Sequence, residues 1–112
     1  MISILIPTYN NIEYLKLCIN SLKKNSFYKN QILLHINEGS DGTVEYANLN
    51  HLEYTYSKVN EGLCVGINKI SKKTKFEYIL YSHDDMYFCP NWDKILIDEL
   101  AFYITSNNLK AF

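Results

Sequence analysis

Short apolar runs alternate along this chain with longer segments whose apolar residues recur at helical spacing. The runs at 2–6, 32–36 and 76–81 are typical of buried strands, and 52–56 alternates as a half-buried strand does. Segment 12–22 repeats its apolar residues every three or four positions, which predicts an amphipathic helix. The other elements that the pattern predicts are helices at 44–48 and 63–70, a helix beginning near Pro90, and the opening of a fifth strand at 109–112.

Local signals indicate where two of these helices begin. Asn10 stands three residues before Glu13, a pattern typical of a capped helix N-terminus. Pro90 suits the first turn of the last helix, where a missing N–H costs nothing. We expect the apolar face of that helix to consist of Trp92, Ile95, Leu96, Leu100 and Tyr103. We expect its acidic residues to be solvated, namely Asp93, Asp98 and Glu99.

The alternation of strands and helices predicts an α/β fold with a mostly parallel sheet flanked by helices. In such sheets ligands bind at the carboxyl ends of the strands. Three polar loops, after Ile6, Ile36 and Tyr81, fall at those ends. The sequence therefore predicts one binding site assembled from three loops.

Composition limits the classes of function. A chain of 112 residues with 47% hydrophobic and 21% charged residues suits a single soluble domain over 1–112. A formal net charge of −1 lacks the basic excess that nucleic-acid binding needs, so we expect no nucleic-acid partner. No apolar run approaches a membrane span, and three cysteines without metal-ligand spacing favour a reduced, cytoplasmic location, including the inner face of a membrane.

Two adjacent carboxylates, Asp84 and Asp85, directly follow the fourth predicted strand. Neighbouring acids stay ionised together most easily when a cation or water screens them. Mg²⁺ and Mn²⁺ prefer carboxylate oxygen and commonly take one or two protein ligands plus substrate phosphates. A solvated pair, or a cap of the next helix, is the alternative. His83 can be a further ligand, a hydrogen-bond partner or a spacer.

The loop at 38–42, Glu-Gly-Ser-Asp-Gly, can bring a carboxylate and backbone amides to a polar ligand, or it can be a plain turn. The chain has no GxxxxGK[ST] or GxGxxG motif, so the usual phosphate-loop and dinucleotide fingerprints are absent. Its three histidines show no spacing typical of a catalytic triad.

Several segments carry patterns that occur together, in this order, in one enzyme family. The first strand ends in Pro-Thr-Tyr-Asn at 7–10, and Leu-x-x-Cys-Ile-x-Ser-Leu follows at 15–22. Asn-Glu-Gly-Ser-Asp-Gly-Thr stands at 37–43, Asn-Glu-Gly-Leu at 60–63 and Ser-His-Asp-Asp at 82–85. In these segments the chain resembles the N-terminal half of family 2 glycosyltransferases, which have the GT-A fold.

The resemblance covers about residues 3–100 and implies a Rossmann-like GT-A domain that ends after the metal-motif strand and its following helix. The implied ligand is a nucleoside-diphosphate sugar, with a UDP-sugar favoured. His83 takes the place of the first Asp of the metal motif, so the implied ligand of Mn²⁺ or Mg²⁺ is Asp85, with Asp84 near the ribose. The nucleotide-sugar site implied by the resemblance comprises Pro7, Thr8, Tyr9, Asn10, Asn37, Glu38, Gly39, Asn60, Gly62, Asn68, His83 and Asp84.

The family's acceptor-activating carboxylate and acceptor pocket come after the metal motif, beyond residue 112. The resemblance thus implies the donor-binding half of an inverting glycosyltransferase, whose acceptor half is missing and whose catalytic base we cannot name. The alternative is a non-catalytic or degenerate nucleotide-binding module that completes its fold with a partner chain. An open sheet edge would favour self-association. A nucleotidyltransferase or a phosphoacceptor receiver domain also uses carboxylates at strand ends, although 8–10 offers no acid to a receiver.

Overall fold

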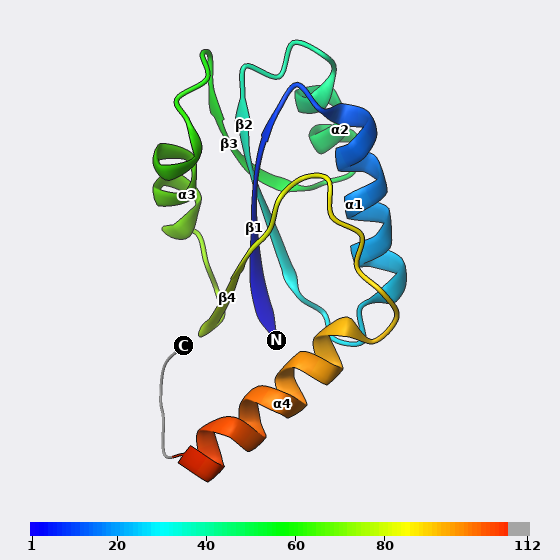
Figure 1. Cartoon of the computed structure of the whole chain (residues 1–112). Coiled ribbons are helices and arrows are strands. Elements are labelled where there is room, and N and C mark those ends of the chain that lie inside the picture. The colour runs from blue at the N-terminus through cyan, green and yellow to red at the C-terminus, as the bar shows by residue number, and fades with distance from the viewer. Residues whose placement is uncertain (108–112) are drawn as a thin grey trace.

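The computed structural model describes residues 1–107 and shows a parallel sheet with helices on both faces (Figure 1). The predicted fifth strand at 109–112 lies outside these residues. The other predicted elements are present, with the strand ends shifted by up to three residues. They are β1 (Ile2–Tyr9), α1 (Ile12–Asn25), β2 (Gln31–Asn37), α2 (Thr43–Leu49), β3 (Glu53–Ser57), α3 (Leu63–Ser71), β4 (Tyr78–Tyr81) and α4 (Trp92–Asn107).

The four described strands are hydrogen-bonded in the order β3-β2-β1-β4, and every pair is parallel. Leu5 of β1 lies in register with Leu33 of β2 and with Tyr81 of β4. The chain adds β2 and β3 on one side of β1 and then crosses over to add β4 on the other. This reversal opens a crevice at the carboxyl ends of β1 and β4, the place where α/β sheets bind ligands.

Each face of the sheet has its own core. Ile4 and Ile6 of β1 pack with Leu15 and Ile19 of α1, and Phe88 closes the same cluster. On the opposite face, Leu5 and Leu33 pack against Ile67 and Ile70 of α3. β1 and β2 therefore bury both faces, which explains why they read as continuous apolar runs.

The first and last helices begin differently from the sequence prediction. Asn11 occupies the N-cap position of α1, without a side-chain capping bond, and Asn10 has a left-handed φ of 44°. Pro90 lies in the turn before α4, which begins at Trp92. The prediction for both caps was therefore wrong by one or two residues, because local signals locate helix ends only loosely.

The prediction for the faces of α4 was partly wrong. Trp92, Leu96 and Ile97 pack against the core, whereas Ile95 and Tyr103 are 60% and 50% exposed. α4 contacts the domain near its first turns and then extends away from the sheet (Figure 1). The core therefore covers only part of the apolar face that the sequence predicted, near the start of the helix.

Asp93, expected in solvent, is fully buried, so that prediction was wrong. Its carboxylate accepts hydrogen bonds from the backbone N–H groups of Phe27 and Tyr28, both at 2.8 Å, and from Asn30 Nδ2 at 2.9 Å. The N–H of Lys94 donates as well, at 3.0 Å. Burial opposes ionisation, but these donors together outweigh it and lower the pKa of Asp93. Asp93 thus fastens α4 to the α1–β2 loop.

Candidate functional site

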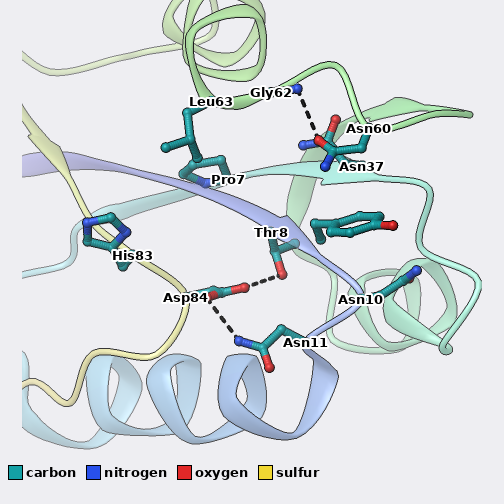
Figure 2. Close-up of a pocket in the computed structure, with 11 residues that line it drawn as sticks. Pro7, Thr8, Asn10, Asn11, Asn37, Asn60, Gly62, Leu63, His83 and Asp84 are labelled. Carbon is teal, nitrogen blue, oxygen red and sulfur yellow. Dashed lines mark hydrogen bonds between the residues drawn. The ribbon is translucent and has the colours of Figure 1, made fainter.

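A polar hollow of about 360 Å³ lies at the carboxyl ends of the strands (Figure 2). The carboxyl ends of β1 and β2 and the segments that follow β1, β3 and β4 contribute to it. Its lining consists of Pro7, Thr8, Tyr9, Asn10, Asn11, Asn37, Asn60, Gly62, Leu63, His83 and Asp84. The residues after Ile6 and Tyr81 converge as predicted, whereas the segment after Ile36 contributes only Asn37, and the β3–α3 loop joins them.

Asp84 joins the two strands that flank the crevice. Its Oδ2 accepts a hydrogen bond from Thr8 Oγ1 at 2.7 Å, and its Oδ1 accepts one from Asn11 Nδ2 at 3.1 Å (Figure 2). The N–H of Ser82 donates to the Leu5 carbonyl at 2.9 Å, which carries the β1–β4 pairing to the start of this loop. A carboxylate offers about four lone-pair sites, so Asp84 keeps capacity to accept from a ligand hydroxyl.

Asn10 combines a strained backbone with an orphaned acceptor. It lies in the hollow's lining with a φ of 44°, where asparagine is tolerated better than most residues. Its Nδ2 donates to Ser40 Oγ at 3.4 Å, while its buried Oδ1 finds no partner among the described residues. Strain and unsatisfied polar atoms collect at ligand sites. A donor on a ligand would satisfy this oxygen.

The β3–α3 loop forms the opposite wall of the hollow. The N–H of Gly62 donates to Asn60 Oδ1 at 3.0 Å, and the N–H of Glu61 donates to Asn37 Oδ1 at 3.0 Å (Figure 2 shows the first). Gly62 has a φ of 85°, a conformation that suits glycine. These bonds fix which polar atoms of Asn37 and Asn60 remain for a ligand.

Cys18 lies beneath the loop that carries the acidic pair. Its Sγ is 3.9 Å from the His83 carbonyl oxygen, and its side chain is fully buried. Burial raises the pKa of this thiol to about 11, against a backbone hydrogen bond with Met86 that lowers it, and the carboxylates of Asp84 and Asp85 add to the rise. Cys18 is therefore a protonated packing residue beside the hollow and no nucleophile at neutral pH.

Nine of the residues expected from the sequence line the hollow, and four do not. Glu38 and Gly39 line a separate hollow beside Tyr54 and Tyr56 of β3. Asn68 is exposed on α3, on the side away from the buried Gly66 and Ile70. Asp85 is exposed next to Asp84 and is not part of the lining.

The sequence prediction missed two residues of the lining, Asn11 and Leu63. Asn11 directly follows the motif at 7–10, and Leu63 is the last residue of the motif at 60–63, so including every residue of the motifs and one more after 7–10 would have found both. His83 was included, and its ring packs edge-on against Tyr81 at 5.2 Å between centroids.

Within residues 1–107, no three His, Cys, Asp or Glu side chains converge as a metal site. A magnesium or manganese ion held jointly by protein and diphosphate needs only one or two carboxylates. Asp85 has an exposed carboxylate at the mouth of the loop, and Asp84 lies beside it with both oxygens already bonded. The donor chemistry of this pair fits a cation of that kind.

The fold and the hollow define a class, a parallel α/β domain with a polar crevice at its topological switch point. The family model described as glycosyl transferase family 2 matches residues 3–105, and the chain belongs to this family. The resemblance and the GT-A fold expected from the motifs are thereby confirmed.

Two curated relatives match this chain over only part of their own length. It is 37% identical over 97 residues to an uncharacterized glycosyltransferase of Rickettsia conorii, covering 81% of this chain and 16% of that protein. It is 30% identical over 99 residues to an uncharacterized glycosyltransferase of Mycoplasma genitalium, covering 79% of this chain and 32% of that protein. The chain thus spans less than a third of these relatives' length.

Solved structures share the architecture. Residues 1–349 of S. aureus TarS in complex with UDP superpose with a TM-score of 0.76 at 22% identity, over 94% of this chain and 32% of that one. The mannosyltransferase PcManGT from Pyrobaculum calidifontis, in complex with GDP-Man and Mn²⁺, gives 0.71 at 16% identity, over 84% of this chain and 30% of that one. No helix among the described residues has the length and hydropathy needed to cross a bilayer.

Proposed function

We propose that this chain is the donor-binding part of an inverting glycosyltransferase and that its hollow binds a nucleoside-diphosphate sugar. The observation that carries the proposal is the Thr8–Asp84–Asn11 cluster, which ties together the ends of β1 and β4 at the switch point. The UDP and GDP-Man complexes of similarly folded proteins support it.

The base and ribose are proposed to bind along the end of β1. Tyr9 lines the hollow and is 49% exposed, so its ring offers a stacking surface for a base. Asp84 can accept from a ribose hydroxyl with its remaining lone pairs. Asn10, with its orphaned Oδ1, is the acceptor available to a ligand N–H.

The diphosphate is proposed to lie at the β4–α4 loop, where Asp85 would hold Mn²⁺ or Mg²⁺ and Asp84 would orient the loop through Thr8 and Asn11. When bound, such an ion would stabilise the negative charge that develops on the leaving diphosphate. Asp84 is the only acid lining the described hollow. We therefore propose that the base that activates the acceptor lies outside the described residues.

The test is titration calorimetry of the chain with UDP, GDP, UDP-GlcNAc and GDP-mannose, with and without Mn²⁺. We expect Mn²⁺ to tighten diphosphate binding by roughly tenfold or more, about 1.4 kcal/mol. We expect Asp85→Ala to abolish that gain, while Asp98→Ala, an exposed acid on α4, keeps it. Equal metal dependence in parent and Asp85→Ala would remove Asp85 from the site. No binding of any of these ligands would favour the degenerate module.

A further inference from the structure

Lys69 of α3 contacts both ends of the loop that carries Asn60. Its Nζ donates to Glu61 Oε1 at 2.7 Å and to Ser57 Oγ at 3.2 Å. Ser57 is the buried last residue of β3, and Glu61 directly follows Asn60. One ammonium group therefore bridges the segment 58–60 at its base. Lys58, Val59 and Asn60 themselves are exposed.

Ser57, the inner contact of Lys69, is held in place by the buried side chain of His35. Ser57 Oγ lies 3.2 Å from Nε2 of His35, whose Nδ1 lies 2.7 Å from Thr55 Oγ1. His35 is fully buried, and a Cβ added to Gly66 would come within 2.7 Å of its ring. Burial first, and Lys69 as well, lower the pKa of His35 against the opposing effect of Asn37. A neutral, tightly packed imidazole thus fixes Ser57.

The outer end of the bridge controls two residues of the hollow. The backbone N–H of Glu61 donates to Asn37 Oδ1, so the position of Glu61 sets the orientation of the Asn37 amide. Glu61 also stands between Asn60 and Gly62, which are joined by their own hydrogen bond. Lys69 lies outside the lining, so its influence on a ligand would be indirect.

We propose that Lys69 is a positioning residue for the nucleotide: it clamps the loop 57–61 in the conformation that presents Asn37 and Asn60 to the ligand. The inference rests on the proposed nucleotide site. Without the ammonium, the loop loses its link between Glu61 and Ser57 and keeps the weaker support of the Glu61–Asn37 and Gly62–Asn60 bonds. Binding must then order the exposed segment 58–60 at a larger entropic cost.

The experiment compares Lys69→Met, which keeps the aliphatic stem, with Lys69→Arg, which keeps the charge. Lys72→Met, an exposed lysine just after the same helix, is the matched control. We expect Lys69→Met to weaken UDP binding in Mn²⁺ roughly fivefold, the upper range for a partly exposed ion pair with an added hydrogen bond. We expect Lys69→Arg and Lys72→Met to bind within about twofold of the parent.

A second measurement needs no ligand. In Lys69→Met, amide hydrogen exchange at Glu61 should accelerate roughly tenfold or more, because local opening frees its N–H from Asn37, while exchange in β1 stays unchanged. Glu61→Gln, which removes the ion pair from the other side, should reproduce both effects if Lys69→Met does not fold.

The outcomes separate this inference from the proposed function. If the parent binds UDP and Lys69→Met binds it equally well, the clamp has no role and the inference is refuted while the nucleotide site stands. If the parent binds none of the nucleotides, the proposed function fails and this inference fails with it. Weaker binding that Lys69→Arg does not rescue, with a global loss of stability, would show a merely structural role and also refute it.

Discussion

Replacing Asp93 by alanine should destabilise the protein more than most surface substitutions. The change leaves four donors without their acceptor: the N–H groups of Phe27, Tyr28 and Lys94 and the side-chain amide of Asn30. Each buried donor left unpaired costs on the order of 1–3 kcal/mol. Because the α1–β2 loop can relax and admit water to some of them, we expect a total of about 3–4 kcal/mol.

The measurement is thermal unfolding followed by circular dichroism at pH 7. One kcal/mol corresponds to about 4 °C or more for a domain of this size, so Asp93→Ala should melt at least ~12 °C below the parent. The control is Asp98→Ala, whose exposed carboxylate forms an ion pair with Lys94. This substitution should change the midpoint by about 2 °C or less. An Asp93→Ala midpoint as high as that of Asp98→Ala would refute the hydrogen-bond account.

The pH dependence tests the charge separately. Hydrogen bonding lowers the pKa of Asp93 below its ordinary value of 3.8, so the stability it contributes is complete above that pH and is lost as pH falls through the lower, folded-state pKa. Asp93→Asn keeps the shape but turns one acceptor into a donor. Its stability deficit should therefore be constant near neutrality and shrink below about pH 3.8. A deficit that persists unchanged in acid would mean that the mismatched donor of the new amide, and not the lost charge, is responsible.

Two further predictions concern packing. Gly66→Ala places a Cβ 2.7 Å from Cδ2 of His35. The overpacking cost of about 1–3 kcal/mol should exceed the helix-propensity gain of about 1 kcal/mol, so the melting temperature should fall. A higher melting temperature would contradict the contact. In thiol titration with a chromogenic disulfide at pH 8, Cys64 and Cys89 should react at once and Cys18 only after unfolding. The reason is that Cys18 is buried and has a pKa of about 11. Prompt reaction of all three thiols would contradict the burial of Cys18.

The sequence predicted the sheet well because its two central strands leave a distinctive pattern. A parallel strand covered on both faces is apolar at most positions, as residues 2–6 and 32–36 are apart from Ser3 and His35. Both of these polar residues are buried with hydrogen-bond partners, Gln31 and Thr55 respectively. The position of each polar loop at a strand's carboxyl end follows from the alternation of strands and helices alone. The motifs at 7–10 and 82–85 therefore came together as predicted, through the bond of Thr8 to Asp84.

Where the loops point was decided only by the tertiary structure. Glu38, expected at the nucleotide, has a φ of 61°, and its N–H donates to the Ser57 carbonyl at 2.7 Å, so it turns toward β3 and away from the crevice. That bond joins residues far apart in the chain, and no local pattern encodes it.

What the sequence by itself determined is the set of elements, their order and the family, because these depend on periodicity and short motifs. Burial of a polar group depends instead on partners that the fold supplies. Asp93 carries the same side chain as Asp98, yet it is buried because donors more than 60 residues earlier in the chain surround it. Lys69 likewise meets Glu61 and Ser57 only because α3 folds back over β3. Burying a charged side chain in this way is unfavourable unless partners from other parts of the chain offset the lost hydration. Only the tertiary structure brings those partners together, so it alone could decide these contacts.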